Sequence, residues 1–334
     1  MKTATKKSKV LSNNESDGND VDSCEDNFEK NSEPFDISLD NAIEQFILDK
    51  DIANVSENTL EIYHYVFKNL KSFLNEGINI SSINKPNLRQ FFVHLNNKEL
   101  KSSTRQIHYR TLNTLFNWLK DEEYIENNPL NNISKPKTPD KYPKHLTEDQ
   151  ATKLLKTAKK GSNTWTGFRN YTIIKCFLGM GLRREELIEA KIDNYDPGKS
   201  SLKVIGKGKK SRIVACTKDL NKTIRKWIKK RGELEEIYDD TIFISRNGDK
   251  LKGRNLNENI TRIQEKAGLE DVQVSPHVLR HTSATQAAKE GMGDYLLKRF
   301  YGWEQSKTAE RYIHASGRDA RKAIAECDPL ENLN

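Results

Sequence analysis

A polar segment near the middle of the chain most constrains how the chain folds. Residues 127–143 read NNPLNNISKPKTPDKYP, with few apolar side chains and several prolines. Proline lacks a backbone N–H donor and disfavours helix in the residue before it, so such a segment ends regular structure. Each side of it is long enough to bury a core of its own. The sequence therefore predicts two domains, over residues 36–127 and 144–327, joined by a linker over 128–143.

Charge is divided unevenly along the 334 residues. Residues 1–40 hold five lysines and ten acidic residues, whereas the other 294 hold 51 basic and 38 acidic residues. Residues 1–35 have the polar composition of a disordered tail, which we interpret as a solvated leader rather than as a competitor of DNA; residues 328–334 form a second short tail. A basic body behind an acidic leader indicates a polyanionic partner, most simply nucleic acid, although lysine-rich surfaces also serve solubility alone.

Several functional classes are excluded by what the chain lacks. No apolar run approaches the roughly 20 residues of a membrane span, and no apolar region follows the basic start as in a secretory signal. The four cysteines lie far apart, which disfavours a zinc site and a disulfide scaffold and fits a reducing cytoplasm. No P-loop, H-E-x-x-H or G-x-S-x-G motif occurs. We therefore expect no metal and no cofactor.

The first domain has helical periodicity. Apolar residues recur at steps of three and four in 60–74, 88–95 and 104–119, which predicts three helices. The polar face of the third helix carries Arg105, His108 and Arg110, next to Lys101. Serine and arginine at a helix start suit phosphate contacts, so Lys101, Arg105 and Arg110 are candidate DNA-binding residues. The alternative is an ordinary charged helix face.

The second domain combines helices with short strands. Thr147 is a predicted helix cap, and an apolar run ends at Gly179 and Gly181. Residues 202–205 and 212–215 predict two strands joined by a glycine-containing turn, residues 241–245 are another short β-like run, and the chain is helical after residue 255. The fold class is therefore mainly α with a small antiparallel sheet.

Five short motifs of the second domain follow one another in order. They are GLRREEL from Gly181 with Arg183, a hairpin turn with Lys207, HVLRH with His277 and Arg280, Gly302-Trp303, and Tyr312. The set resembles the tyrosine recombinases, also called the phage integrase family, which show G-L-R-x-x-E-L, a strand turn with Lys, H-x-L-R-H, G-H or G-W, and Tyr nine residues later. Any one motif is weak evidence, whereas the ordered set is specific.

The resemblance covers about residues 37–325 and implies the architecture. The first domain is similar to the family's helical, SAM-like core-binding domain, including Asn128-Pro129 near its end. The second is similar to the catalytic domain. The resemblance further implies double-stranded DNA as partner, a homo-oligomer that forms a tetramer on two DNA sites, and a 3′-phosphotyrosine intermediate. In the family, a tail such as residues 317–327 docks on a neighbouring subunit; packing on its own subunit is the alternative.

The residue types account for the chemistry. Two guanidiniums can clamp non-bridging phosphate oxygens and stay charged at any working pH, and Arg183 and Arg280 are the candidates for this role. Without a metal, such cations supply most of the electrostatic stabilisation.

Tyr312 is the predicted nucleophile, and because the pKa of a free phenol is about 10, it needs nearby cations and a base to lose its proton. His277 is the candidate base or hydrogen-bond partner of Tyr312. Lys207 is the candidate donor of a proton to the departing oxygen, which the resemblance implies is the 5′-oxygen; Lys209 and Lys210 lie in the same turn and are the alternatives.

Other residues near these motifs have supporting roles. Many family members have a second histidine where this chain has Trp303, whose indole N–H donates a hydrogen bond but transfers no proton, so we expect it to position and pack. We expect Glu186 to orient a neighbour and His281 to satisfy local hydrogen bonds. Tyr295 and Tyr301 are rival nucleophiles that fit better as packing aromatics.

The predicted function is a metal- and ATP-independent, site-specific DNA recombinase in the cytoplasm, associated with the nucleoid. The leading role is integration or excision of a mobile element, and the runner-up is Xer-type resolution of chromosome or plasmid dimers. A type IB topoisomerase uses similar arginine, lysine and tyrosine chemistry and is a second enzyme class. A DNA-binding regulator with a decayed site is the non-catalytic alternative.

Overall fold

The computed structural model describes residues 37–75, 77–138, 143–206 and 210–316. Four features of the sequence analysis lie outside these residues, namely the acidic tail, the turn lysine Lys207, the segment 317–327 and the short tail 328–334. The chain divides into two compact units, one on each side of residues 139–140.

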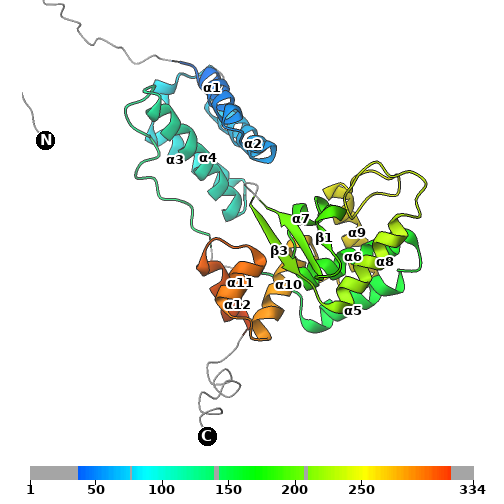
Figure 1. Cartoon of the computed structure of the whole chain (residues 1–334). Coiled ribbons are helices and arrows are strands. Elements are labelled where there is room, and N and C mark those ends of the chain that lie inside the picture. Colours follow the sequence, from blue (N-terminus) through cyan, green and yellow to red (C-terminus); the bar gives the residue numbers. More distant parts are fainter. Residues whose placement is uncertain (1–36, 76, 139–142, 207–209, 317–334) are drawn as a thin grey trace, which may run out of the picture. The chain divides into compact units, whose positions relative to one another are not determined.

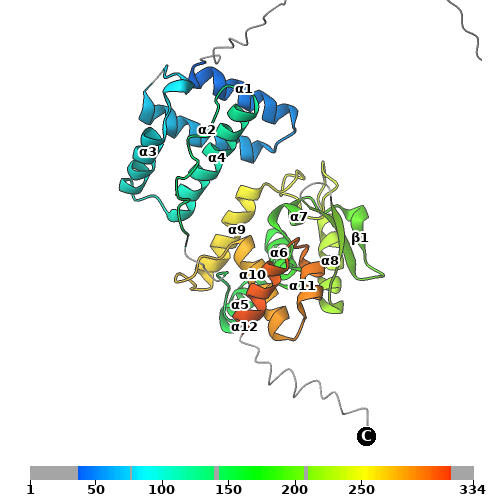
Figure 2. The same ribbon diagram turned by 90° about the vertical axis from the view of Figure 1, so that its left-hand side faces the viewer.

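The first unit is helical throughout its regular structure. Its elements are α1 (Leu39–Ile52), α2 (Glu57–Leu74), the 3-10 turn η1 (Ile80–Ser82), α3 (Lys85–Asn97) and α4 (Ser102–Asp121). The side chain of Ser38 caps α1, and Asn84 caps α3 directly before the helix. Figure 2 shows the four α-helices packed together. Their core contains the fully buried rings of Phe46, Phe67, Phe91 and Phe116.

The three predicted helices of this unit are present as α2, α3 and α4, but one face of α4 differs from the prediction. His108, expected on the polar face, is fully buried, whereas Ile107 is 40% exposed. The His108 ring donates through Nδ1 to the Thr104 carbonyl at 3.0 Å, and its Nε2 lies 3.2 Å from the Asn69 amide. Burial lowers the pKa of His108. A hydrogen-bonded imidazole can occupy the core, so His108 takes a buried position although the periodicity placed it on the polar face, and Ile107 lies exposed instead.

Residues of the predicted linker contribute to the first unit as well. Asn128 is buried and donates to Asn113 and Asn117 of α4, at 3.2 and 2.7 Å. Leu130, next along the chain after Pro129, is a member of the hydrophobic core. The packed part of this unit thus continues beyond α4.

The second unit contains more helices and the sheet. Its elements are α5 (Glu148–Lys160), α6 (Trp165–Met180), α7 (Arg184–Ile188), the 3-10 turn η2 (Ile192–Asn194), β1 (Tyr195–Asp196), β2 (Ser201–Ile205), β3 (Ser211–Ala215), α8 (Lys218–Arg231), α9 (Gly253–Lys266), α10 (Pro276–Lys289), α11 (Asp294–Tyr301) and α12 (Ser306–Ser316). As predicted, Thr147 caps α5, through a hydrogen bond from the backbone of Gln150.

The sheet is antiparallel in the order β1-β2-β3. The predicted hairpin is confirmed: Leu202 pairs with Val214, and Val204 pairs with Arg212. Figures 1 and 2 show the sheet beside the helices of its unit. Its buried valines, Val204 and Val214, belong to the same hydrophobic core as the buried residues of α6.

The apolar run 241–245 forms only isolated β-bridges, at Thr241 and Ile244. Side chains occupy several of its carbonyls: Arg231 donates to Thr241, Trp227 to Ile242 and Arg169 to Ile244. Hydrogen bonds that a neighbouring strand would supply thus come from side chains instead.

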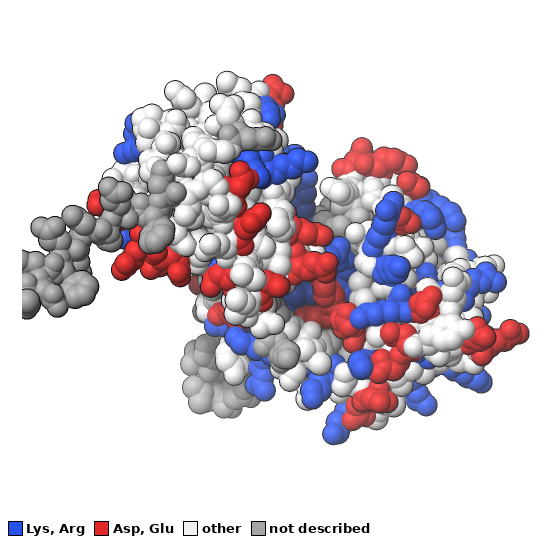
Figure 3. All heavy atoms as spheres, turned by 90° about the horizontal axis from the view of Figure 1, so that it is seen from above, with Lys and Arg blue, Asp and Glu red and all other residues white. Residues whose placement is uncertain are grey.

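A second apolar cluster joins α10, α11 and α12, and it includes Tyr301 and Tyr312. In the described part of the chain, no helix combines the length and the apolarity that crossing a bilayer requires. The face drawn in Figure 3 carries both basic and acidic side chains, so this face is not uniformly positive although the net charge of the chain is +8.

Candidate active site

Helix ends and helix packing bring the two predicted phosphate-binding arginines together. Arg183 is the N-cap of α7 and follows Gly181, which ends α6 with φ 57° in the left-handed region. Arg280 lies within α10, which packs on α6, and it is 5% exposed. Although 97 residues separate them in sequence, both guanidiniums approach the same carboxylate, that of Glu186, with nitrogen–oxygen distances of 2.7 Å for Arg183 and 3.9 Å for Arg280.

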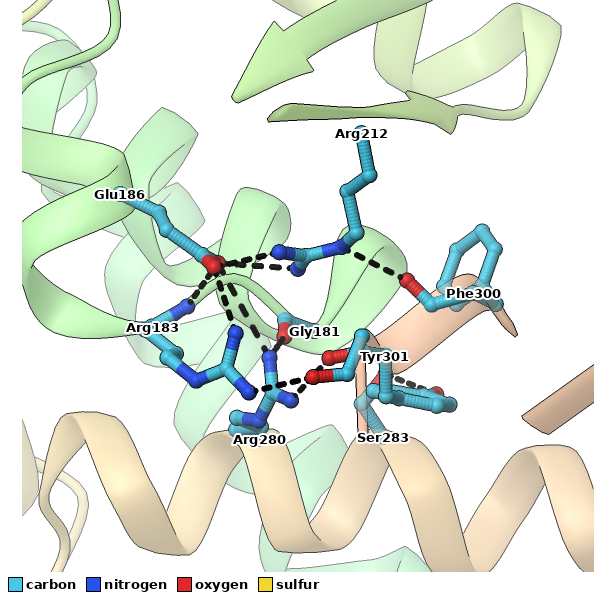
Figure 4. A network of polar contacts seen from close by, with 9 residues as sticks. Gly181, Arg183, Glu186, Arg212, Arg280, Ser283, Phe300 and Tyr301 are labelled. Atoms are coloured by element: carbon cyan, nitrogen blue, oxygen red, sulfur yellow. Dashed lines mark hydrogen bonds and ion pairs between the residues drawn. The ribbon is translucent and has the colours of Figure 1, made fainter. Parts of the chain in front are cut away.

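Glu186 is a buried anion among three cations (Figure 4). It is 2% exposed and accepts hydrogen bonds from the side chains of Arg183 and Arg212 and from the backbone N–H of Arg183. Burial alone raises the pKa of a carboxyl, but the hydrogen bonds from Arg212 and Arg183 outweigh it, so the pKa of Glu186 lies below its ordinary value. Glu186 is therefore ionised at neutral pH and orients the arginines, as the sequence analysis expected.

The same three guanidiniums bind the C-terminal end of α11. Arg212 donates to the carbonyl of Phe300 at 3.1 Å, Arg280 to that of Tyr301, and Arg183 to that of Gly302 at 2.7 Å. The last carbonyls of a helix have no partner within the helix and form the negative end of its dipole, so three cations are favourable there. Gly302, with φ 62°, ends the helix.

Trp303 follows this helix end and packs against Tyr312, the candidate nucleophile. Its indole stacks on the ring of Tyr312, with centroids 4.7 Å apart and planes 3° apart, and also stacks with Tyr301 at 5.0 Å. The guanidinium carbon of Arg280 lies 5.9 Å from the centroid of the indole. Trp303 thus packs between the arginine cluster and α12, in agreement with a positioning role.

Tyr312 is held as a neutral, buried phenol. It is 3% exposed, and its hydroxyl is hydrogen-bonded to Nδ1 of His281. Burial raises the pKa of Tyr312 to about 12, although Arg280 pulls it down. Burial and the nearby His277 and Arg280 lower the pKa of His281 to about 4. Both groups are therefore uncharged at neutral pH.

The remaining predicted site residues divide into three groups. His277 is exposed in the first turn of α10, and the hydrogen bond to Tyr312 expected from it comes in this structure from His281. Lys207 lies outside the described residues, between β2 and β3. The DNA-binding candidates belong to the first unit: Lys101 is the exposed N-cap of α4, Arg105 bonds to Asn96, and Arg110 donates to Gln106 at 2.9 Å.

The two rival tyrosines differ from each other. Tyr301 is 1% exposed, and its hydroxyl pairs with Ser283 at 2.8 Å, so it is a packing aromatic as expected. Tyr295 is 67% exposed, so its predicted packing role is wrong. It lies in the first turn of α11, on the side of the helix away from the core.

Sequence reasoning missed Arg212 as a member of this site. A signal was available, because Arg212 stands two residues before the buried Val214 in a predicted strand, and alternate residues of a strand share a face. A charged residue at an inward position of a strand needs a buried partner, and that partner is Glu186.

The chain matches two sequence models of known families. Residues 144–318 match the Phage integrase family, and residues 38–137 match the Phage integrase SAM-like domain. Tyrosine recombinase XerC of Staphylococcus carnosus (strain TM300) is 26% identical over 277 residues, which are 82% of this chain and 92% of that protein. Tyrosine recombinase XerC of Alcanivorax borkumensis is 31% identical over 229 residues, 68% of this chain and 74% of that protein.

Solved structures share the fold. The Tn1549 transposon integrase in complex with transposon right end DNA has a TM-score of 0.71 at 18% identity, covering 87% of this chain and 100% of that chain. A lambda integrase tetramer bound to a Holliday junction has a TM-score of 0.68 at 17% identity, covering 85% and 80%. With the family match over more than half of its length, the chain belongs to the phage integrase family of tyrosine recombinases, enzymes that transfer DNA strands.

Proposed function

We propose that this protein cuts and rejoins double-stranded DNA at specific sites through a covalent 3′-phosphotyrosine on Tyr312, and that it thereby integrates or excises a mobile element. The observation that carries the proposal is the convergence of Arg183, Arg280, Trp303 and Tyr312 at the end of α11. These residues come from different helices and connections, so their convergence is a property of the fold rather than of one motif.

The reaction exchanges one phosphodiester for another. Tyr312 Oη forms a bond to phosphorus, the bond from phosphorus to the 5′-oxygen breaks, and that oxygen takes up a proton, for which Lys207 is the candidate donor. Arg183 and Arg280 hold the non-bridging oxygens, whose negative charge grows in the transition state. The exposed His277 is the candidate acceptor of the phenol proton. A 5′-hydroxyl of another strand then attacks the phosphotyrosine and releases the phenol, which needs no ATP.

Cleavage requires Tyr312 to leave the environment described here. A phenol that is 3% exposed and hydrogen-bonded to His281 has no path to a DNA phosphate. Binding of DNA must therefore be accompanied by a movement of the tyrosine side chain or of α12.

The proposed assembly is a homo-tetramer on two DNA sites, working in the cytoplasm at the nucleoid. The lambda integrase neighbour, a tetramer bound to a Holliday junction, supports this assembly, and the Tn1549 neighbour supports the mobile-element role. A second candidate role is Xer-type dimer resolution, because the two similar recombinases named above are both XerC.

The test is a search for the covalent adduct without metal. DNA sites bound by the purified protein are selected from fragments that flank its gene, and nicked versions are incubated with wild type, Tyr312→Phe and, as matched control, Tyr295→Phe. On a denaturing gel we expect an adduct from wild type and from the exposed-tyrosine control, and none from Tyr312→Phe.

Each other outcome identifies a different function. Site-specific binding with no adduct from any variant would replace the enzyme by a DNA-binding regulator. An adduct from Tyr312→Phe would move the nucleophile to another tyrosine. Relaxation of supercoiled plasmid that lacks the site, without exchange between two sites, would indicate a type IB topoisomerase.

A further inference from the structure

Arg212 uses every nitrogen of its guanidinium to join three elements (Figure 4). From β3, its Nη1 and Nη2 donate to the two carboxylate oxygens of Glu186 in α7, Nη2 at 2.9 Å, and its Nε donates to the Phe300 carbonyl at the end of α11 at 3.1 Å. Its side chain is 15% exposed. Such a bidentate pairing fixes the orientation of the Glu186 carboxylate and also neutralises its charge.

The three arginines share Glu186 unequally. Arg212 bonds both carboxylate oxygens, the Arg183 side chain bonds one at 2.7 Å, and Arg280 stays at 3.9 Å, beyond hydrogen-bonding distance. A buried carboxylate without a full partner would draw the other two guanidiniums onto itself. We propose that Arg212 is a positioning residue for strand transfer, which occupies Glu186 so that Arg183 and Arg280 keep free N–H groups for the DNA phosphate.

The charges of the cluster agree with this role. Three guanidiniums face one carboxylate, which leaves two positive charges for a phosphodiester that carries one negative charge in the ground state and gains a second in the transition state. Preorganised charge of this kind acts where the charge develops. Without Arg212, only one positive charge would remain.

The contact with α11 extends the role to Trp303. Arg212 also packs against Gly302: a Cβ there would lie 3.0 Å from Arg212 Cδ and 3.2 Å from its Nε. The segment from Phe300 to Trp303 is thus held against the arginine cluster by its carbonyls and by this close approach.

This inference rests on the function proposed above. The experiment measures the rate of single-turnover adduct formation at saturating DNA, and the DNA Kd is determined separately. The variants are Arg212→Gln, Arg212→Lys, Glu186→Gln and the double Arg212→Gln/Glu186→Gln, and the control is Arg225→Gln, an exposed arginine of α8. We expect Arg212→Gln to lower the adduct rate about 50-fold, less than the roughly 10²–10³-fold loss seen when a group that touches the reacting oxygen is removed, because Arg212 acts through Arg183 and Arg280. The DNA Kd should change less than about twofold. Arg212→Lys, which keeps the charge but loses the fork, should recover part of the rate.

The double variant separates positioning from simple loss of structure. If Glu186 without Arg212 captures the phosphate-binding arginines, removal of its charge should restore the rate at least about fivefold over Arg212→Gln, a coupling that a double-mutant cycle measures. The proposal would be overturned if the fold-losses of Arg212→Gln and Glu186→Gln simply multiplied in the double variant. It would also be overturned if Arg212→Gln formed the adduct at the wild-type rate. If Arg212→Gln does not unfold cooperatively, it is not natively folded, and Arg212→Lys becomes the deciding variant. A wild-type adduct rate in Arg212→Lys would overturn the proposal, and a partial loss of rate would support it. A wild type that forms no adduct would instead refute the proposed function.

Discussion

The pair of His281 and Tyr312 consists of two titratable groups that the protein keeps neutral. With a pKa of about 4 for the imidazole and about 12 for the phenol, both stay uncharged over the whole physiological range. Their hydrogen bond therefore persists without charge at neutral pH. Under the proposed function, this neutral phenol has to give up its hydrogen bond to His281 before it can attack a DNA phosphate.

The lowered pKa of His281 predicts a loss of stability in acid. Unfolded His281 binds a proton below about pH 6.5, whereas the folded residue resists protonation down to about pH 4, so stability falls as the pH drops through this window. Partial exposure to solvent limits the effect to about 1–2 kcal/mol. Urea unfolding at pH 7 and pH 4.5 should show a smaller pH effect in His281→Asn than in wild type. An unchanged effect in that variant, with the exposed His64→Asn as control, would contradict the prediction.

The residues of the site differ in how visible they are in the sequence. Arg183, Arg280, Trp303 and Tyr312 stand in motifs whose order is specific, so the sequence predicts them as a group. The strand pattern places Arg212 on the same face as the buried Val214, but it does not name the partners of Arg212. Phe300 lies 88 residues away and becomes its neighbour only in the packed fold. Local patterns report which face a side chain occupies, and only the packed fold supplies its partner.

Among the elements, the end of α6 and the end of α11 set the geometry of the site together. Gly181 ends α6, its carbonyl accepts from Arg280, and the next residues carry Arg183 into the cluster. A Cβ on Gly181 would come within 2.1 Å of Cε1 of Tyr301. Two helix ends thus approach each other at a position where only glycine fits, by its positive φ and by the space available.

Gly181→Ala should therefore destabilise the second unit and disturb the site. The left-handed conformation costs a residue with a Cβ about 1–2 kcal/mol, and the clash with Tyr301 adds about 1–3 kcal/mol of overpacking. We expect the free energy of unfolding to fall by about 3 kcal/mol, with loss of adduct formation. Gly293→Ala is the matched control, because Gly293 has an ordinary φ and a Cβ on it would meet no atom within 4 Å. Equal stability of the two variants would refute this argument.

The elements themselves were largely predictable where the pattern was long. The helices α2 to α4 follow from apolar periodicity, and the β2–β3 hairpin follows from two β-branched runs around a glycine-containing turn. The short strand β1 has only two residues and no pattern of its own. The run 241–245 looks like a strand in sequence, but side chains from α6 and α8 take its carbonyls, and no local rule shows that.

At the scale of the whole molecule, charge and architecture agree with a DNA-binding enzyme of two units. The net charge is +8, yet acidic side chains lie among the basic ones on the face in Figure 3. On that face, phosphate contacts would depend on particular lysines and arginines rather than on a uniformly positive surface. Such contacts release counterions from DNA, and the number of contacts determines how steeply affinity falls with salt.

DNA affinity should fall about 10³-fold between 50 and 200 mM salt if about six phosphates are contacted. Within this total, Lys101 and Arg110 are exposed at α4, so Lys101→Ala/Arg110→Ala should make the plot of log affinity against log salt less steep by about 1.8, at about 0.9 for each lost contact. Lys199→Ala is the control, because this exposed lysine pairs with Asp196 in the second unit. Fluorescence anisotropy on the selected site would measure the slopes. A wild-type slope in the double variant would remove α4 from the DNA interface, and a flat slope in wild type would refute the electrostatic argument for the entire chain.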